Sequence, residues 1–114
     1  MSLERVLKTL EAFGLSRSDS EVYLYLAKKG PRKGSEVANA LKISKQQLYS
    51  SLKNLKNKGI VNTSFDRPAL FSALAFEEVL ELLIRIRVDQ AKAIRQTKNE
   101  LLKSWRSMKW RQHT

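Results

Sequence analysis

The last third of the sequence contains neither glycine nor proline. Between Phe76 and Met108 the chain is rich in Leu, Ile, Glu, Arg, Lys, Gln and Ala, residues that sit well in an α-helix. This predicts one helix of about 30 residues, which would be roughly 45 Å long. A compact unit of this chain's size does not need a helix of that length. We therefore predict a folded unit over residues 1–75 and a long C-terminal helix over residues 76–110.

Four shorter helices are predicted in the first 60 residues, because apolar side chains recur at spacings of three and four. They are expected at about residues 2–13, 16–29, 35–41 and 44–58. Serines that cap helix N-termini fit three of the starts, and glycines or a glycine-proline pair fit the ends. The capping candidates are Ser16, Ser35 and Ser44.

The apolar period changes after Gly59. Residues 60–64 and 69–72 are short β-prone runs on either side of a turn-like insert, which predicts a two-stranded hairpin over about residues 60–73. Helix, helix, short turn, helix and hairpin is the order of a winged helix-turn-helix. The predicted fold is therefore mainly α with a small β-hairpin, a winged helix-turn-helix followed by a long C-terminal dimerisation helix. In that fold the helix at about 44–58 would enter a DNA major groove, with the hairpin as the wing.

The charge balance favours a polyanionic partner. The 22 Lys and Arg residues exceed the 11 Asp and Glu residues, giving a net charge of +11, and the pI is near 10.2. Residues 28–58 alone hold nine cations and one acid, Glu36. A Lys-rich helix face is often only a solvated surface. Here the cations coincide with the predicted recognition helix, which favours double-stranded DNA as the partner.

The predicted recognition helix has side chains suited to DNA. Leu48, Leu52 and Leu55 share one face, which leaves polar residues on the others. Lysines and hydroxyls bind phosphates, and Gln46 or Gln47 could read an adenine edge, unless Gln47 is used for capping. Arg67 either enters a minor groove or is an ordinary turn arginine. The candidate DNA-contacting residues are Arg32, Lys33, Ser35, Ser44, Lys45, Gln46, Gln47, Tyr49, Ser50, Lys53 and Arg67.

Several function classes are not expected. The chain has no cysteine and a single histidine, His113, so neither a structural metal nor a cofactor is predicted. It lacks a glycine-rich phosphate loop and a carboxylate pair suited to catalysis, so we predict that it is not an enzyme. No stretch is long and apolar enough to cross a membrane. We expect a cytoplasmic, nucleoid-associated protein.

The long helix is predicted to mediate a homodimer. Its first half is apolar on more than one stripe, so we expect it to pack on both the winged unit and a partner. Its second half has a thinner seam interrupted by Gln90, Thr97 and Lys98, which favours loose helix pairing over a strict heptad. A helix folded back on its own winged unit is the alternative, and parallel and antiparallel pairing are both left open. The predicted interface residues are Leu83, Ile86, Gln90, Ile94, Leu101, Trp105 and Met108.

The two halves of this helix differ in charge. Residues 76–89 contain four acids and two arginines, whereas seven cations and one acid, Glu100, follow Gln90. The basic end, which includes Trp105 and Trp110, could contact flanking DNA or a membrane surface. We favour a solubilising end with Trp105 in the dimer seam, and we predict no membrane partner.

Short motifs are spread across the predicted winged unit: Gly14-Leu15-Ser16, Glu21-Val22-Tyr23-Leu24, Lys29-Gly30-Pro31, Gly34-Ser35-Glu36-Val37-Ala38, Ile43-Ser44-Lys45, Leu48-Tyr49, Leu52, Leu55 and Lys58-Gly59-Ile60-Val61. In combination they resemble the archaeal TrmB-like winged-helix regulators, in the wider group that includes MarR-like proteins. The resemblance covers about residues 14–73 and implies a DNA-binding regulator. Members that sense sugars continue into a large ligand domain absent from this sequence, so no small-molecule effector is expected.

Three functions are compatible with these features. The first is a transcriptional regulator that binds double-stranded DNA as a homodimer. The second is a non-specific architectural, chromatin-like DNA-binding protein, which the high positive charge would support. The third is a protein-interaction module docked through its long helix, which the basic recognition helix disfavours.

Overall fold

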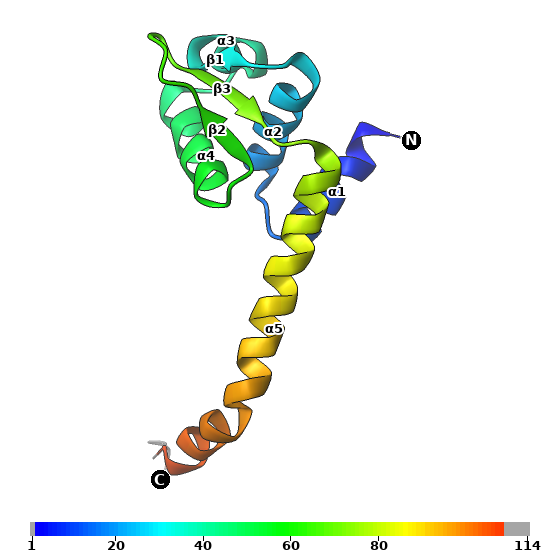
Figure 1. Cartoon of the computed structure of the whole chain (residues 1–114), viewed down its shortest axis with the longest axis vertical. Helices are drawn as coiled ribbons and strands as arrows, with labels where there is room; N and C mark the ends of the chain where they lie inside the picture. Colours follow the sequence, from blue (N-terminus) through cyan, green and yellow to red (C-terminus); the bar gives the residue numbers. More distant parts are fainter. Residues whose placement is uncertain (1, 109–114) are drawn as a thin grey trace.

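The computed structural model describes residues 2–108, in which a bundle of short helices and a small sheet is followed by one long helix (Figure 1). The described part measures 58 × 32 × 30 Å, and the long helix accounts for the longest dimension. The elements are α1 (Leu3–Ala12), α2 (Arg17–Lys29), β1 (Arg32–Lys33), α3 (Gly34–Leu41), α4 (Lys45–Asn57), β2 (Val61–Thr63), β3 (Leu70–Ala73) and α5 (Phe76–Ser107).

Local capping positions three of the short helices. Ser2, Ser16 and Ser44 each accept a backbone N–H at the start of α1, α2 and α4, which satisfies a donor that the helix cannot pair. The prediction that Ser35 caps the third helix is wrong, because α3 begins at Gly34 with Lys33 as its N-cap residue. The Lys33 N–H donates to the Glu36 carboxylate at 2.9 Å.

The sheet has three strands rather than the predicted two. β2 and β3 form the expected hairpin, with Asn62 opposite Ser72, and β1 adds to the other edge of β3 in the order β1-β3-β2. All pairings are antiparallel, and Arg32 lies opposite Phe71. The sequence did not indicate β1, because two cations carry no alternating apolar pattern and their partner strand is distant along the chain.

The core is centred on α2 and α4. Tyr23 is fully buried, and its hydroxyl donates to the Leu74 carbonyl at 2.7 Å. This bond ties α2 to the segment between β3 and α5, and burial raises the pKa of Tyr23 to about 12. The core side chains that are at most 1% exposed are Leu10, Val22, Tyr23, Leu26, Val37, Leu48, Leu52, Leu55, Ile60 and Val79.

The long helix α5 joins this core only near its start. Val79 and Leu83 are buried against the short helices, and Arg87 donates to the Ala12 carbonyl at the end of α1 at 2.6 Å. Beyond Arg87 nearly every described residue is exposed. The helix therefore projects away from the winged unit instead of folding back on it (Figure 1).

Two predictions about α5 need qualification. Leu83 was expected at a partner interface, but it is 2% exposed and packs in the protomer's own core, one turn from Val79. The predicted C-terminal helix extended to residue 110, and residues 109 and 110 lie outside the described part. Within residues 2–108, no helix is both long enough and apolar enough to cross a membrane.

Candidate nucleic-acid interface

Helix α4 divides its side chains between a buried face and an exposed face. Leu48, Leu52 and Leu55 are at most 1% exposed and pack in the core. Helical geometry then directs most of the remaining positions toward solvent, although Ser51 is also buried. We call five of the exposed residues of α4 the recognition face: Lys45, Gln46, Tyr49, Ser50 and Lys53.

Tyr49 is held in place from two sides. Its ring meets the Phe71 ring edge-on, with centroids 6.2 Å apart and an interplanar angle of 74°. Its hydroxyl lies against Gly34, where an added Cβ would come within 2.7 Å of the oxygen. Glycine at this position therefore lets the tyrosine reach across the start of α3. The ring links α4 to α3 and the sheet while remaining 45% exposed.

Ser44 and Gln47 are already engaged within the protein. The Ser44 hydroxyl accepts the Gln47 N–H at 3.0 Å as the helix cap. The Gln47 amide nitrogen lies 3.5 Å from the Ser18 hydroxyl on α2, which draws this side chain toward the protein. Within residues 2–108 Gln46 makes no such hydrogen bond, so it is the better placed of the two amides to meet a ligand in front of α4.

The cations of the β1–α3 junction form a second part of the surface. Arg32 is half-buried, and its guanidinium donates to the Pro31 carbonyl at 2.8 Å. Lys33 and Ser35 are exposed at the N-terminus of α3. The positive end of a helix dipole adds to the charge of Lys33 at this point, so an anion is favoured there.

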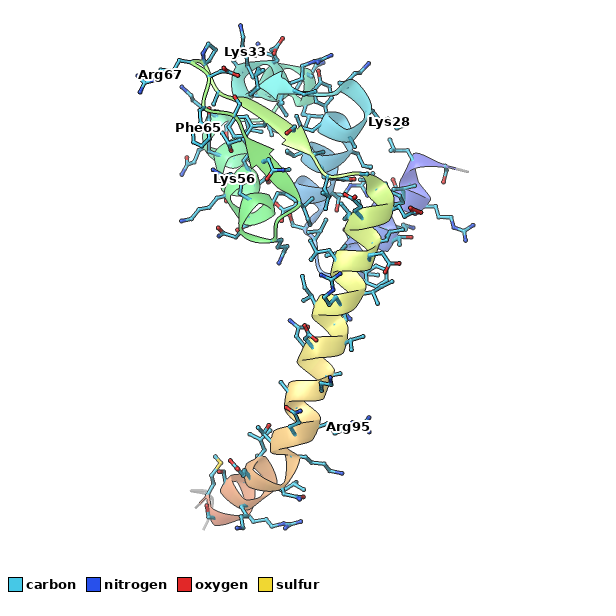
Figure 2. The ribbon with its side chains drawn as sticks, in the orientation of Figure 1. Lys28, Lys33, Lys56, Phe65, Arg67 and Arg95 are labelled. Carbon is cyan, nitrogen blue, oxygen red and sulfur yellow. The ribbon has the colours of Figure 1, made fainter. Side chains whose placement is uncertain are left out.

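The turn of the wing carries an aromatic residue that sequence reasoning did not select. Phe65 is fully exposed beside the exposed Arg67, and both extend from the tip of the hairpin (Figure 2). The turn is fixed by Ser64, whose hydroxyl accepts the backbone N–H groups of Asp66 and Leu70. An exposed Phe is inconspicuous in the sequence, because nothing local shows which way a turn side chain points.

A cleft of about 280 Å³ separates α4 from the wing. Lys56 and Asn57 line it with the recognition-face residues Tyr49 and Lys53, and the buried Thr63 hydroxyl of β2 has no hydrogen-bond partner within the described chain. Lys56, Asn57 and Thr63 were not among the predicted contacts. They become candidates only when the sheet is placed beside α4.

The cations on this side of the molecule are not neutralised by acids. Among residues 2–108, the ion pairs all involve Arg17, which meets Glu4 at 2.8 Å, Glu11 at 3.5 Å and Glu21 at 3.6 Å. Those pairs lie on α1 and α2, and the Arg17 hydrogen bond lowers the pKa of Glu4. The lysines of α4, together with Lys33 before α3 and Lys42 after it, therefore keep a positive surface available for an anion.

The predicted interface residues of α5 lie along its projecting part. Gln90, Ile94, Leu101, Trp105 and Met108 are exposed, whereas Ile86 is half-buried near the winged unit. The exposed apolar members are between 50% and 63% exposed. Within residues 2–108 no three His, Cys, Asp or Glu side chains gather as a metal site would require.

The chain matches the family model described as "Sugar-specific transcriptional regulator TrmB" over residues 10–77, more than half of its length. A curated relative, the HTH-type sugar sensing transcriptional regulator TrmBL1 of Pyrococcus furiosus, is 32% identical over 105 residues. Those residues are 92% of this chain and 30% of the relative, so the chain spans less than a third of that protein's length.

Solved structures with the same arrangement include TrmBL2, an archaeal chromatin protein with a novel mode of DNA binding. It superposes with a TM-score of 0.80 at 22% identity, covering 92% of this chain and 41% of that one. The ST1889 protein of Sulfolobus tokodaii gives 0.65 at 23% identity, covering 82% and 98%. The regulator Tm0710 of Thermotoga maritima gives 0.59 at 20% identity, covering 90% and 80%.

These likenesses confirm the winged-helix fold, with a three-stranded sheet in place of the predicted hairpin. The matching family and the named relatives are regulators or a chromatin protein and not enzymes, in agreement with the prediction that the chain is not an enzyme.

Proposed function

The chain belongs to the TrmB family of transcriptional regulators, and on that premise we propose that it binds double-stranded DNA as a homodimer. The recognition face of α4 enters the major groove, and the wing contacts the neighbouring backbone. The observation that carries this proposal is the set of exposed cations and amides on the face of α4 opposite Leu48, Leu52 and Leu55.

The recognition face supplies both kinds of contact that a DNA reader needs. Lys45, Lys53 and the hydroxyls of Tyr49 and Ser50 suit phosphate oxygens, which position a protein on the duplex. Gln46 offers an amide donor and acceptor that match an adenine edge. Because Tyr49 is braced by Gly34 and Phe71, its hydroxyl is presented without a large loss of side-chain entropy.

The β1–α3 junction and the wing extend the contact beyond one groove. Lys33 and Ser35 contact the DNA backbone on one side of α4. Arg67 and Phe65 reach the adjacent minor groove on the other side. Arginine is favoured in narrow minor grooves, and apolar side chains can wedge between base steps there. Lys56 and Thr63, in the cleft beside the wing, add a phosphate contact between these two regions.

Homodimerisation places two recognition helices on one duplex. The exposed apolar residues of α5 would form a large uncovered patch on a monomer, which soluble proteins rarely keep. A twofold dimer covers this patch with a second copy of itself, which is the commonest symmetry. Two linked winged units then bind DNA more tightly than one, because the second contact is intramolecular. The protein acts in the nucleoid.

Architectural binding is the second candidate. It is supported by the likeness to the chromatin protein TrmBL2 and by the net charge of +11. Phosphate contacts alone give tight binding that does not depend on sequence. In that case the amide of Gln46 would contribute little to affinity, whereas the lysines would contribute at every site.

Binding to a pool of genomic promoter fragments, in competition with excess random duplex and over a range of salt, tests the proposal. A sequence-specific regulator stays bound to a subset of fragments under competition, and Gln46→Ala then changes which fragments remain bound. An architectural protein loses all fragments in parallel, and Gln46→Ala has no effect on the pattern. Absence of binding at low salt would contradict both, and a monomeric mass in solution would contradict the dimer.

A further inference from the structure

Eight of the apolar residues that α5 leaves partly or fully exposed form one stripe along the helix, and Leu82, Ile86, Ala93 and Leu102 lie outside it or at its edge. Most of them recur at positions seven apart in two interleaved sets, the pattern that keeps a stripe facing a partner helix when two helices supercoil. Gln90 and Thr97 lie beside this stripe and do not interrupt it, whereas Arg87 and Lys98 do. We call the apolar stripe the seam, and it comprises Leu80, Ile84, Val88, Ala91, Ile94, Leu101, Trp105 and Met108.

The seam begins at an apolar cleft in the winged unit. Phe76 precedes Leu80 by one turn on the same side of α5, is 37% exposed, and lines a cleft of about 640 Å³ with Leu3, Val6 and Leu24. Leu3 is 58% exposed. The lining residues of this cleft come from α1, α2, the end of β3 and the start of α5. A helix that follows the seam toward the winged unit would end in it.

The charges beside the seam are opposite at its two ends. Residues 76–89 carry four acids and two arginines, whereas the described residues 90–108 carry five cations and one acid. Parallel helices would place the basic halves together, where like charges repel. Antiparallel helices place each basic half beside an acidic one, which is the arrangement that electrostatic complementarity favours.

We propose that in the homodimer the two α5 helices pair antiparallel, with the basic end of each helix seated in the cleft of the other protomer. This inference rests on the proposed function only in assuming a homodimer. The occupant of the cleft is a second copy of this chain, and the partner's Trp105 and the partner's Met108 enter it beside Phe76 and Leu3.

One antiparallel register places seam residues level with seam residues of the partner and most charged residues near opposite charges. When Ile84 lies level with the partner's Leu101, Leu80 lies level with the partner's Trp105. In the same register, four charged positions fall within one residue of an opposite charge on the other helix. The matched positions are Glu78 with the partner's Arg106, Glu81 with the partner's Lys103, Arg85 with the partner's Glu100, and Asp89 with the partner's Arg95.

Arg87 is one of two exceptions, because this register places it level with the partner's Lys98. Its guanidinium donates to the Ala12 carbonyl at the end of α1 at 2.6 Å. That hydrogen bond draws the charge toward the protomer's own winged unit. Lys92, near the centre of the register, lies within one residue of the partner's Lys92. Two like-charge pairings are therefore set against four opposite ones.

Cysteine cross-linking tests the orientation, and the chain contains no cysteine of its own. We would compare Ile84→Cys, Leu101→Cys and the double variant under oxidising conditions on a non-reducing gel. In the antiparallel dimer, position 84 lies about 25 Å from its own copy on the partner, far beyond disulfide reach. The double variant should therefore form a covalent dimer, and neither single variant should. Gln96→Cys, exposed and away from the seam, is the matched control.

The outcomes separate this inference from the proposed function. Covalent dimers of the single Ile84→Cys variant would show parallel pairing and overturn the antiparallel arrangement, while leaving a dimer in place. A dimeric mass without cross-linking of the double variant would overturn the register. A monomeric mass at all concentrations would overturn the dimer itself, and with it this part of the proposed function.

Charge reversal supplies an independent test that does not depend on cysteine. Glu78→Lys with Glu81→Lys should weaken the dimer by about tenfold, because each pair of lysines then faces cations of the partner. Adding Lys103→Glu and Arg106→Glu to the same chain should restore the affinity. Weakening without restoration would contradict the antiparallel register. Both measurements are made by sedimentation equilibrium at low salt.

Discussion

The winged unit and the projecting part of α5 use similar residues in opposite ways. In the winged unit, leucines and valines from five helices and a sheet bury one another, and the lysines lie on the outside of a closed core. In the projecting part, residues 88–108, isoleucine, leucine, tryptophan and methionine stay about half exposed on a single helix. The winged unit closes its core within one protomer, whereas the apolar face of the projecting part stays open to solvent and is covered only in the dimer that we propose.

The difference also concerns the cations. On α4 the cations lie on the exposed face of a helix whose opposite face is anchored in the core by buried leucines. The surface that they form is therefore rigid and open to a large polyanion. On α5 they flank an apolar seam and face an acidic segment in the proposed dimer. In our proposal, the same kind of charge binds DNA in one region and pairs helices in the other. The first two predictions below separate the two regions, and the next two sharpen the description of the winged unit.

The largest expected effect is on the core of the winged unit. Leu48→Ala removes a fully buried side chain and should lower the free energy of unfolding by about 2–5 kcal/mol, because part of the cavity stays empty. The matched variant Leu101→Ala, in the seam, should leave the unfolding of an isolated protomer unchanged at low concentration. Urea denaturation at several protein concentrations measures both. Equal losses would contradict the division into two regions.

The next effect is on association. Ile94→Asp places a carboxylate in the middle of the seam and should weaken the dimer by at least about 100-fold, because a buried charge must be desolvated without a partner. Gln96→Asp introduces the same charge off the seam and should have little effect. Analytical ultracentrifugation gives the dissociation constants, and circular dichroism checks that both variants keep their helices. An Ile94→Asp protein that dimerises like the wild type would contradict the seam.

A smaller effect concerns alkaline pH in the core. Burial raises the pKa of Tyr23 to about 12, above its ordinary value of 10, so the folded state holds this proton more tightly than the unfolded state. The resulting stability is complete below pH 10 and is lost as the pH rises toward 12. Tyr23→Phe should remove that part of the pH dependence. It should also lower the free energy of unfolding at neutral pH by about 1 kcal/mol, because the hydrogen bond to Leu74 is removed. Denaturation curves at pH 7 and pH 11 measure both effects.

The smallest effect is in the turn between α3 and α4. Lys42 adopts a left-handed conformation with φ of 56°, which costs a residue with a side chain more than glycine. Lys42→Gly should therefore raise the free energy of unfolding by about 0.5–1 kcal/mol. Lys58→Gly, at the other end of α4 in an ordinary right-handed conformation, should not. A lower thermal midpoint for Lys42→Gly would contradict the strain at this turn.

Local patterns in the sequence predicted most of the winged unit. The caps at Ser16 and Ser44 and the buried leucines of α4 depend on spacings of three and four within one helix, and these were correct. Strand β1 was missed because its pairing with β3 joins segments almost forty residues apart. The same limit applied to Leu83, since helical periodicity shows that a face is apolar without showing whether the protomer or a partner covers it.

The candidate interface was predictable to a similar degree. Exposure of Lys45, Gln46 and Lys53 follows from the leucine spacing alone. The engagement of Gln47 by Ser18 and the close approach of Tyr49 to Gly34 depend on where α2 and α3 pack, which no local pattern encodes. The roles of Phe65 and Thr63 could not be predicted for the same reason, because their surroundings depend on the path of the wing.

The most direct test of the account is the salt dependence of binding to duplex DNA by the Lys45→Ala/Lys53→Ala variant. Its control is Arg5→Ala/Lys8→Ala, which removes equal charge from α1, on the side of the unit away from α4 (Figure 1). If α4 is the recognition helix, the first variant should bind more weakly, and its slope of log affinity against log salt should fall by roughly one unit for each phosphate that it no longer binds. The second variant should retain the wild-type slope. Equal slopes in all three proteins would contradict DNA recognition by α4.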